Sequence, residues 1–326
     1  VDFLSLIKSE PKINEISINL KEIDITELNK LSSIIKPSNF KSILNNNIKR
    51  GKLISEIIIF LSEDGNFKNF IAKGSVKNLE AQLVGQLYLK ETRLNFFADK
   101  SDILIKNIFG GLNEIKISDG DIKLNLEDGV KLSSNFKSFL NLDDEQITKY
   151  LKFLDNSNLI KNLKNIKAEL TNNFKIDLDS TYKVRNYDYN ITGEVEKSEL
   201  KLLKPFKNNF VTEEIKTIYL SDLKINSNFK PNKINLNAEG KYSLNNLDFL
   251  KINLLNIFDK DLINLKLNMD YRNSLVLDLL NYRKSKGSIA NLYLDLDKYK
   301  DQIEIKNLNY EEGKKSIDIS GLKFNK

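Results

Sequence analysis

The chain of 326 residues contains no cysteine and no histidine. Without cysteine it can form no disulfide, no thiolate metal site and no thiol nucleophile. Without histidine it lacks the usual general base near neutral pH, the commonest transition-metal ligand and the centre of Ser-His-Asp catalysis. Tryptophan is also absent, which removes the usual stacking surface for sugars. We therefore expect a protein that is not an enzyme and needs no metal or cofactor.

The motifs of nucleotide-binding and hydrolytic enzymes are missing as well. No P-loop spacing precedes Gly51, Gly240 or Gly313, and neither G-x-G-x-x-G nor G-x-S-x-G occurs. The acidic residues within 119–128 do not follow the EF-hand order, so turns explain them better than calcium does. The acidic residues 143–145 are explained by capping and the dipole of a helix start. A glycosidase needs only two carboxylates, so the residue inventory leaves an enzyme acting on glycans open. It is the weakest alternative, because tryptophan is absent and no particular carboxylate pair stands out.

Long hydrophobic runs are also scarce. The longest apolar block, Ile57–Leu61, is far shorter than the ~20 residues that a membrane-spanning helix needs. No basic segment followed by an apolar one opens the sequence, so a signal peptide is not predicted. The first residue is Val1 rather than methionine. We expect either a mature chain or a fragment whose ends, and with them an upstream membrane anchor, are missing.

Charge is plentiful but dispersed. Lysine and arginine number 51 against 45 acidic residues, a net charge of +6. Lysines such as Lys123 and Lys266 alternate with apolar residues, and the densest basic cluster, 283–286, is expected in a turn. Nucleic-acid binders concentrate positive charge on a stripe with aromatic partners. We therefore expect solvated lysines and no nucleic-acid partner, with weak attraction to anionic lipid head groups as an open possibility.

The strongest positive signal is an alternation of apolar and polar residues. Such alternation over four to eight residues indicates a strand with one dry and one wet face. Turn sequences separate many of the alternating runs, at 63–66, 118–120, 127–129 and 311–313. The pattern predicts about 18–20 antiparallel strands, spaced ~4.8 Å apart. The runs are centred on Ile16/Ile18/Leu20, Ile122/Leu124/Leu126, Ile176/Leu178, Ile234/Leu236/Ala238, Leu265/Leu267/Met269, Leu275/Leu277, Leu292/Leu294/Leu296 and Ile303/Ile305.

Two regions depart from this alternation and predict short amphipathic helices, at 24–50 and 143–167. Asp24 is a suitable helix cap, with Glu27 completing a capping box. A second helix is expected after Pro37, with Ile48 on its apolar face and Gly51 ending it. Packing onto the sheet explains both apolar stripes better than binding to a membrane or a partner.

Glycines also recur at a nearly regular interval. A glycine followed two positions later by an apolar residue occurs at Gly74, Gly120, Gly193, Gly240 and Gly287. The spacing is about 47 residues when the helical segment at 143–167 is left out, which suggests a repeated β-meander unit. The alternative is that these glycines simply mark hairpin ends. Periodicity alone does not separate a closed sandwich or barrel from an open sheet with an uncovered dry face.

The order of these elements resembles that of the AsmA-like superfamily, in particular its YhdP/TamB type. The similarity is strongest over 16–142 and extends less specifically over 168–326. It rests on pattern and order rather than on a signature motif. It divides the chain into a YhdP-like region with a helix pair at 1–142, a helical insertion at 143–167 and a repetitive AsmA/TamB-like β region at 168–326. The segments that carry it are ISINLKEIDITELNKLSSII at 16–35, KRGKLISEIIIFL at 49–61, GNFKNFIAKGSVKNLEA at 65–81, DGDIKLNLEDGVKL at 119–132 and SSNFKSFLNL at 133–142.

The resemblance implies a mainly β, elongated, antiparallel sheet curled into an open apolar groove. It further implies a periplasmic protein anchored to the bacterial inner membrane that moves phospholipid toward the outer membrane and supports envelope integrity. No catalytic residues transfer from such a family. The main alternative is a scaffold or chaperone for outer-membrane protein assembly, which would use sheet edges; an outer-membrane barrel fits the helical regions poorly. The expected groove lining is Ile176, Leu178, Ile234, Leu236, Leu265, Leu267, Leu275, Leu277, Leu292, Leu294, Leu296, Ile303 and Ile305.

Overall fold

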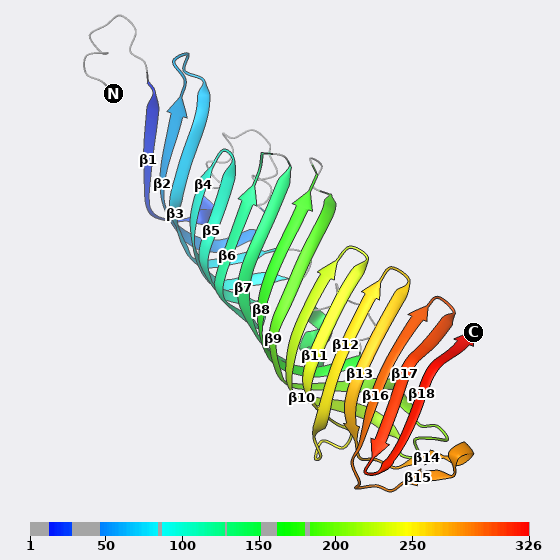
Figure 1. Ribbon diagram of the computed structural model, residues 1–326. Helices are drawn as coiled ribbons and strands as arrows, with labels where there is room; N and C mark the ends of the chain where they lie inside the picture. Colours follow the sequence, from blue (N-terminus) through cyan, green and yellow to red (C-terminus); the bar gives the residue numbers. More distant parts are fainter. Residues whose placement is uncertain are drawn as a thin grey trace, which may run out of the picture. The chain divides into compact units, whose positions relative to one another are not determined.

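A computed structural model of the chain describes residues 13–27, 46–83, 87–127, 129–150, 162–179 and 183–325. Within these ranges the protein is mainly β, as predicted, and its strands run from β1 to β18. Sixteen strands form one antiparallel sheet in which nearly every strand pairs with its neighbours in sequence, and β1 and β18 are its edges (Figure 1). The two remaining strands, β14 and β15, form a separate hairpin between β13 and β16.

The strands are long, and most exceed ten residues. They are β1 Glu15–Asp24, β2 Ile48–Leu61, β3 Phe67–Gln82, β4 Tyr88–Asp99, β5 Asp102–Leu112, β6 Ile115–Asn125, β7 Val130–Leu142, β8 Leu163–Leu178, β9 Val184–Phe206, β10 Ile215–Lys230, β11 Lys233–Ser243, β12 Leu250–Asp259, β13 Leu262–Tyr271, β14 Leu275–Leu277, β15 Tyr282–Lys284, β16 Ala290–Tyr299, β17 Gln302–Glu312 and β18 Lys315–Asn325. All the alternating runs fall in or directly beside these strands.

Tight hairpins account for much of this topology. Two residues connect β5 to β6, β10 to β11, β12 to β13, β16 to β17 and β17 to β18. In these loops Asn113, Asn232, Lys260, Lys300 and Gly313 have positive φ. Positive φ in a two-residue loop matches the right-handed twist of the flanking strands, which is why asparagine and glycine are favoured there. Local turn chemistry thus joins each of these strands to the next one in the sheet.

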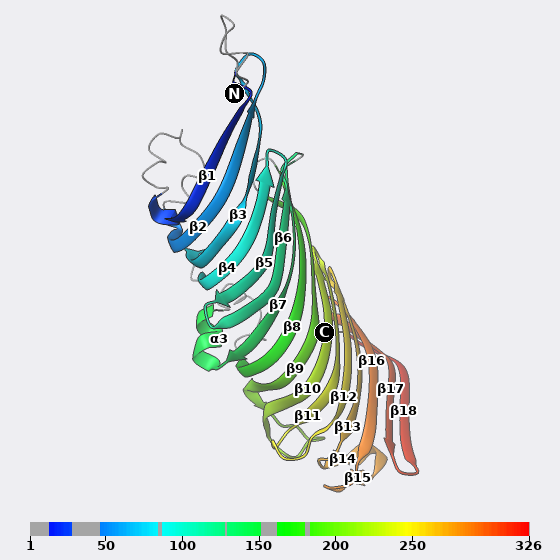
Figure 2. The ribbon, with the colours of Figure 1, turned by 90° about the vertical axis from the view of Figure 1, so that its left-hand side faces the viewer.

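Irregularities inside the strands correct one prediction. Residues 118–120 are not a turn but lie within β6, where Asp119 has a φ of 52°. Comparable left-handed residues, Asn78, Glu91 and Asn107, stand at register shifts in β3, β4 and β5. An extra residue of this kind bends a strand and increases its twist. These bulges therefore produce the bends that are visible in the strands of Figure 2.

Four of the five recurring glycines are not hairpin ends. Gly74, Gly120, Gly193 and Gly240 lie inside β3, β6, β9 and β11, whereas Gly287 lies in the loop before β16. At Gly74 a Cβ atom would stand 2.1 Å from the carbonyl oxygen of Ile54 on the neighbouring strand. Glycine is required there because any side chain would collide with that backbone.

The helical predictions are confirmed only in part. Helix α3, Asp144–Tyr150, lies in the predicted 143–167 segment (Figure 2), and Gln146 N donates to Asp143 Oδ1 at 2.9 Å as a cap requires. Its continuation to residue 167 is wrong, because β8 begins at Leu163. Gly51 does not end a helix either, since it lies in β2. Of the predicted helix pair at 24–50, residues 25–27 and 46 are helical and 47 lies in a turn; the remainder falls in strands or outside the described residues.

The chain divides into two compact units, 1–138 with 173–186 and 139–172 with 187–326. In unit 1 a small core gathers around Leu53, Val76 and Leu79. In unit 2 the core consists of Ala168, Val195, Leu223 and Ala238, with partly buried side chains around it. Among the described strands, those outside the β14–β15 hairpin all belong to one sheet, so neither core lies between two large sheets.

Candidate functional site

The register of unit 2 aligns apolar side chains across β11, β12, β13, β16, β17 and β18. Directly paired residues of antiparallel strands project on the same face of the sheet. The resulting surface is termed the apolar face here. Its four rows, each read from β11 to β18, are Gly240-Ile252-Met269-Leu292-Tyr310-Ile317, Ala238-Leu254-Leu267-Leu294-Leu308-Ile319, Leu236-Asn256-Leu265-Leu296-Ile305-Leu322 and Ile234-Phe258-Ile263-Lys298-Ile303-Phe324.

The apolar face brings together the expected lining residues of β11, β13, β16 and β17. Most are half-buried, and Ile234 and Ile303 are exposed at 37% and 38%. Leu275 and Leu277 are not strand neighbours of this set, because they belong to the separate β14–β15 hairpin. Ile176 and Leu178 lie at the end of β8, and Leu178 is the last residue of that strand. The expected lining residues therefore do not all lie on one sheet, because Leu275 and Leu277 stand in a separate hairpin.

The opposite side of the same strands is largely polar, with Leu255 and Ile257 of β12 as apolar exceptions. Lys266 in β13 pairs with Asp295 in β16 at 3.1 Å, and Lys306 pairs with Asp297 at 2.7 Å. Burial is the largest single effect on the pKa of Asp297 and raises it. The hydrogen bonds from Lys306 and Asn264 and the charges of Lys306 and Lys266 together outweigh burial and hold this pKa below its usual range. Lys266 thus projects from the face opposite the apolar one, as expected for a solvated lysine, and in addition it forms a cross-strand ion pair.

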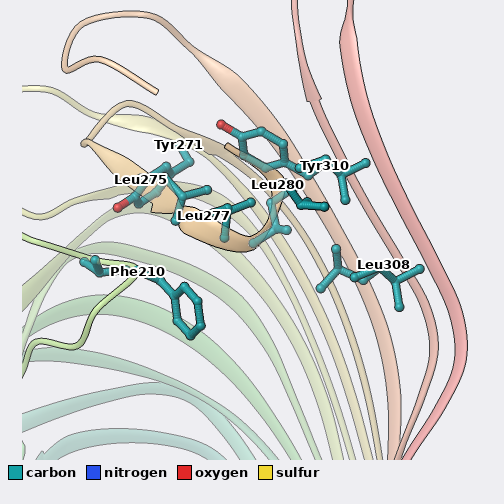
Figure 3. A pocket seen from close by; sticks show the side chains of 11 residues that line it. Phe210, Tyr271, Leu275, Leu277, Leu280, Leu308 and Tyr310 are labelled. Carbon is teal, nitrogen blue, oxygen red and sulfur yellow. The ribbon is translucent and has the colours of Figure 1, made fainter. Parts of the chain in front are cut away.

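An apolar pocket of about 490 Å³ lies where the apolar face meets the excursion between β13 and β16 (Figure 3). One wall is the sheet, which contributes Leu292, Leu308 and Tyr310. The facing wall is the cap, defined as β14, the 3-10 turn η3 (Asp278–Leu280), β15 and the loop 207–214. The full lining is Phe210, Val211, Tyr271, Leu275, Leu277, Leu280, Leu292, Leu308, Tyr310, Ile317 and Ile319.

The two parts of the cap are tied to each other by hydrogen bonds. Val276 N donates to the carbonyl oxygen of Phe210 at 3.0 Å. The hydroxyls of Thr212 and Ser274 are 2.7 Å apart. An ion pair between Lys286 and Glu213 at 3.1 Å adds a third link. The loop after β9 and the β14–β15 hairpin therefore form one wall although they lie far apart in the sequence.

A buried lysine anchors the cap to the sheet. Lys284 is only 2% exposed, and its ammonium donates to the carbonyl oxygens of Arg272 at 2.9 Å, Ser285 at 3.0 Å and Ser288. Burial lowers the pKa of this lysine. The expectation of a solvated basic turn at 283–286 is wrong for Lys284, because its three donors satisfy backbone groups that the sharp excursion leaves without strand partners.

A second polar cluster closes the side of the cap next to β17. Glu312 accepts hydrogen bonds from the hydroxyls of Tyr282 and Ser288. These bonds hold the pKa of the Glu312 carboxyl below its usual range. The Tyr282 and Tyr310 hydroxyls are 3.0 Å apart, and their rings meet edge to face. The cluster thus uses the polar ends of the tyrosines and leaves the ring of Tyr310 on the pocket wall.

Both tyrosines of the pocket lining are neutral and have hydroxyl partners. Tyr271 donates to the carbonyl oxygen of Ser274 at 3.2 Å. Burial, with smaller contributions from Glu213 and Tyr310, raises the pKa of Tyr271 to about 12. Burial also raises the pKa of Tyr310. The pocket therefore presents hydrocarbon surfaces and no charge to its interior at neutral pH.

Unit 1 carries an aligned apolar row of its own. Across β1 to β6 the successive partners are Ile18, Ile57, Ala72, Ala98, Ile103 and Leu124. Two residues of β1 on this face are large and exposed: Ile18 in the row itself at 38%, and Ile16, two positions before it, at 41%. Large apolar side chains therefore stand partly uncovered in both units.

The described ranges contain no group of three or more acidic residues placed to hold a metal ion. No described helix is long and apolar enough to cross a membrane. The sequence analysis did not predict the cap, and of the pocket lining it named only Leu275, Leu277 and Leu292. It missed Phe210, Val211, Tyr271, Leu280, Leu308, Tyr310, Ile317 and Ile319. The available signal was the break in alternation at 273–289, where an excursion replaces a two-residue hairpin.

No family model, curated protein or solved structure matches the chain.

Proposed function

We propose that this chain is a non-enzymatic carrier of lipid, whose acyl chains lie along the apolar face. The observation that carries the proposal is the register: one row, from Ala238 in β11 to Ile319 in β18, is apolar at every directly paired position, and the other rows are apolar except at Asn256 and Lys298. A row of this kind offers one side chain per strand, at intervals of ~4.8 Å, to a ligand that lies across the strands. The resemblance stated above extends the proposal to phospholipid transport between the inner and outer membranes.

The physical need for such a surface is large. Exposing a chain of about 16 carbons to water costs roughly 12 kcal/mol, at ~0.8 kcal/mol per methylene. A continuous apolar face removes much of that cost at every position along the path. Large partly exposed side chains, among them Phe258 and Phe324, are otherwise a liability for a soluble protein, and contiguous exposed apolar patches usually mark interaction sites.

The test compares two neighbouring positions on opposite faces of β13. Leu267→Asp places a charge in the apolar face, whereas Asn268→Asp places the same charge on the polar face. We expect Leu267→Asp to lower the rate of phospholipid transfer between vesicles at least tenfold and Asn268→Asp to leave it nearly unchanged. Thermal melting of both variants checks that the fold survives. Equal rates in the two variants would contradict the proposal.

Photocrosslinking supplies an independent readout. A benzophenone side chain at Leu294 should capture phospholipid from vesicles, and one at the adjacent Tyr293, which projects from the other face, should not. The second candidate function, a scaffold for outer-membrane proteins, would use the backbone of an edge strand such as β18 instead of the apolar face. Capture of an unfolded outer-membrane protein by a benzophenone in β18, without lipid capture at Leu294, would favour that candidate.

A further inference from the structure

We propose that the capped apolar pocket is a discrete binding site for one acyl chain of a single-tailed amphiphile, with a long-chain fatty acid as the simplest case. The inference deepens the proposed function and rests on it, because the sheet wall of the pocket is part of the apolar face. It adds a place where a chain is held between two walls instead of lying on one. Such a site should bind more tightly and with a defined stoichiometry.

The geometry separates the pocket from the rest of the apolar face. In the pocket, Leu277 and Leu280 of the cap stand across from Leu308 of β17, and Phe210 closes a third side (Figure 3). The volume of about 490 Å³ falls within the ~300–1,000 Å³ range of small-molecule sites. A second wall increases the apolar area that an occupant buries, and binding strength follows that area.

The chemistry of the lining selects a hydrocarbon. All lining side chains are aliphatic or aromatic, and both tyrosine hydroxyls have partners outside the pocket. A peptide, a sugar or a nucleotide would bury polar groups there without hydrogen bonds, at a cost of about 1–3 kcal/mol for each group. An acyl chain carries no such groups. Its polar end must therefore remain outside, toward solvent.

The mouth of the pocket is marked by exposed apolar residues. Leu280 is 57% exposed and Phe210 is 51% exposed, although both line the pocket. A side chain that contacts both the cavity and solvent stands at an entrance. The cap itself is held by Lys284 and by the Glu312 cluster, so this wall stays in place. The occupant enters past Leu280 and Phe210.

The absence of tryptophan from the sequence makes a direct test possible. Leu280→Trp introduces a single fluorophore at the mouth, and Leu247→Trp introduces one at an 82% exposed leucine outside the pocket. Bromine on the acyl chain quenches indole fluorescence on contact. We expect 9,10-dibromostearate to quench Leu280→Trp saturably, at one equivalent per chain, and to leave Leu247→Trp nearly unaffected. Equal quenching of both variants, or none of either, would overturn the inference.

A second measurement covers the case in which tryptophan itself fills the mouth. Binding of cis-parinaric acid to the unmodified chain should show one tight site, which Leu280→Asp weakens at least tenfold and Leu247→Asp does not. Leu280 is exposed, so the aspartate is tolerated by the fold, and melting curves check this. Loss of phospholipid transfer in Leu267→Asp with the tight site intact supports both proposals. A tight site without any transfer overturns only the proposed function; transfer without a tight site overturns only this inference.

Discussion

Replacing Gly240 by alanine should destabilise unit 2 because the sheet leaves no room for a side chain there. The Cβ atom would lie 2.5 Å from the carbonyl oxygen of Asp222 and 2.7 Å from the Cα of Leu223. Both atoms belong to the backbone of β10, at a bulge where Asp222 has a φ of 52°. No rotamer change relieves such a contact. The bulge must move, and with it Leu223, which is part of the unit 2 core.

The size of the effect follows from known overpacking costs. Forcing an extra carbon into a packed site typically costs about 1–3 kcal/mol. For a domain of roughly 150–250 residues this corresponds to a fall in melting temperature of about 2–12 °C. The matched control is Gly111→Ala in β5, where the nearest atoms to the Cβ stand at 3.4 and 3.7 Å. There the smaller entropy of the unfolded chain should leave stability unchanged or higher, by up to ~1 kcal/mol.

Urea and thermal unfolding, followed by circular dichroism at the strand band, measure both variants. The reasoning predicts an earlier transition for Gly240→Ala and no loss for Gly111→Ala. If the two variants melt alike, close approach of the strands is not what requires glycine at the bulge. An earlier unfolding transition in both variants would indicate that any added side chain at a glycine of these strands lowers stability, whatever its distance from the neighbouring backbone.

Two further predictions concern the anchors of the cap. Lys284→Met removes the ammonium that donates to the carbonyl oxygens of Arg272, Ser285 and Ser288. We expect it to lower the free energy of unfolding by about 1–3 kcal/mol and to accelerate hydrogen exchange in 272–289. The Glu312 carboxyl has a lowered pKa in the folded chain, so it stabilises the fold above its ordinary pKa of 4.5. That stabilisation is lost as the pH falls through the lowered pKa. Glu312→Gln should therefore reduce the pH dependence of the melting temperature measured between pH 7 and pH 3.

Much of the fold was predictable because side-chain alternation and turn chemistry are local properties. The alternation of apolar and polar residues identified the strands, and turn sequences such as 63–66 and 311–313 indicated hairpins between them. The two-residue loops at Asn113, Asn232, Lys260 and Lys300 have positive φ but were not predicted. The bulges were not predictable, because Asp119 looks the same in a turn as in a bent strand. Each bulge changes the register, so alternation alone did not establish which residues face each other across strands.

The pocket was less predictable than the strands, because it depends on contacts between distant segments. Nothing local to Phe210 indicates that its carbonyl oxygen accepts from Val276. Lys284 resembles any surface lysine in the sequence, and its burial arises only once the excursion turns back onto β16. Leu275 and Leu277 were expected to lie in the same sheet as the other lining residues. They belong instead to the cap, from which they line the same pocket as Leu292.

The register also distinguishes between the two candidate functions in physical terms. A polypeptide that adds to a sheet edge pairs with the backbone of one strand and contacts the side chains of that strand. It gains nothing from apolar residues aligned several strands away. A hydrocarbon that lies across the strands contacts each of them in turn, and it benefits only when bulges keep every apolar set on the same face. The bulge in β17 does this: without the shift between Asp295 and Leu296, Leu308 and Tyr310 would face away from Leu294 and Leu292. The maintenance of the face across that irregularity is what an acyl-chain surface requires and what an edge-binding scaffold does not.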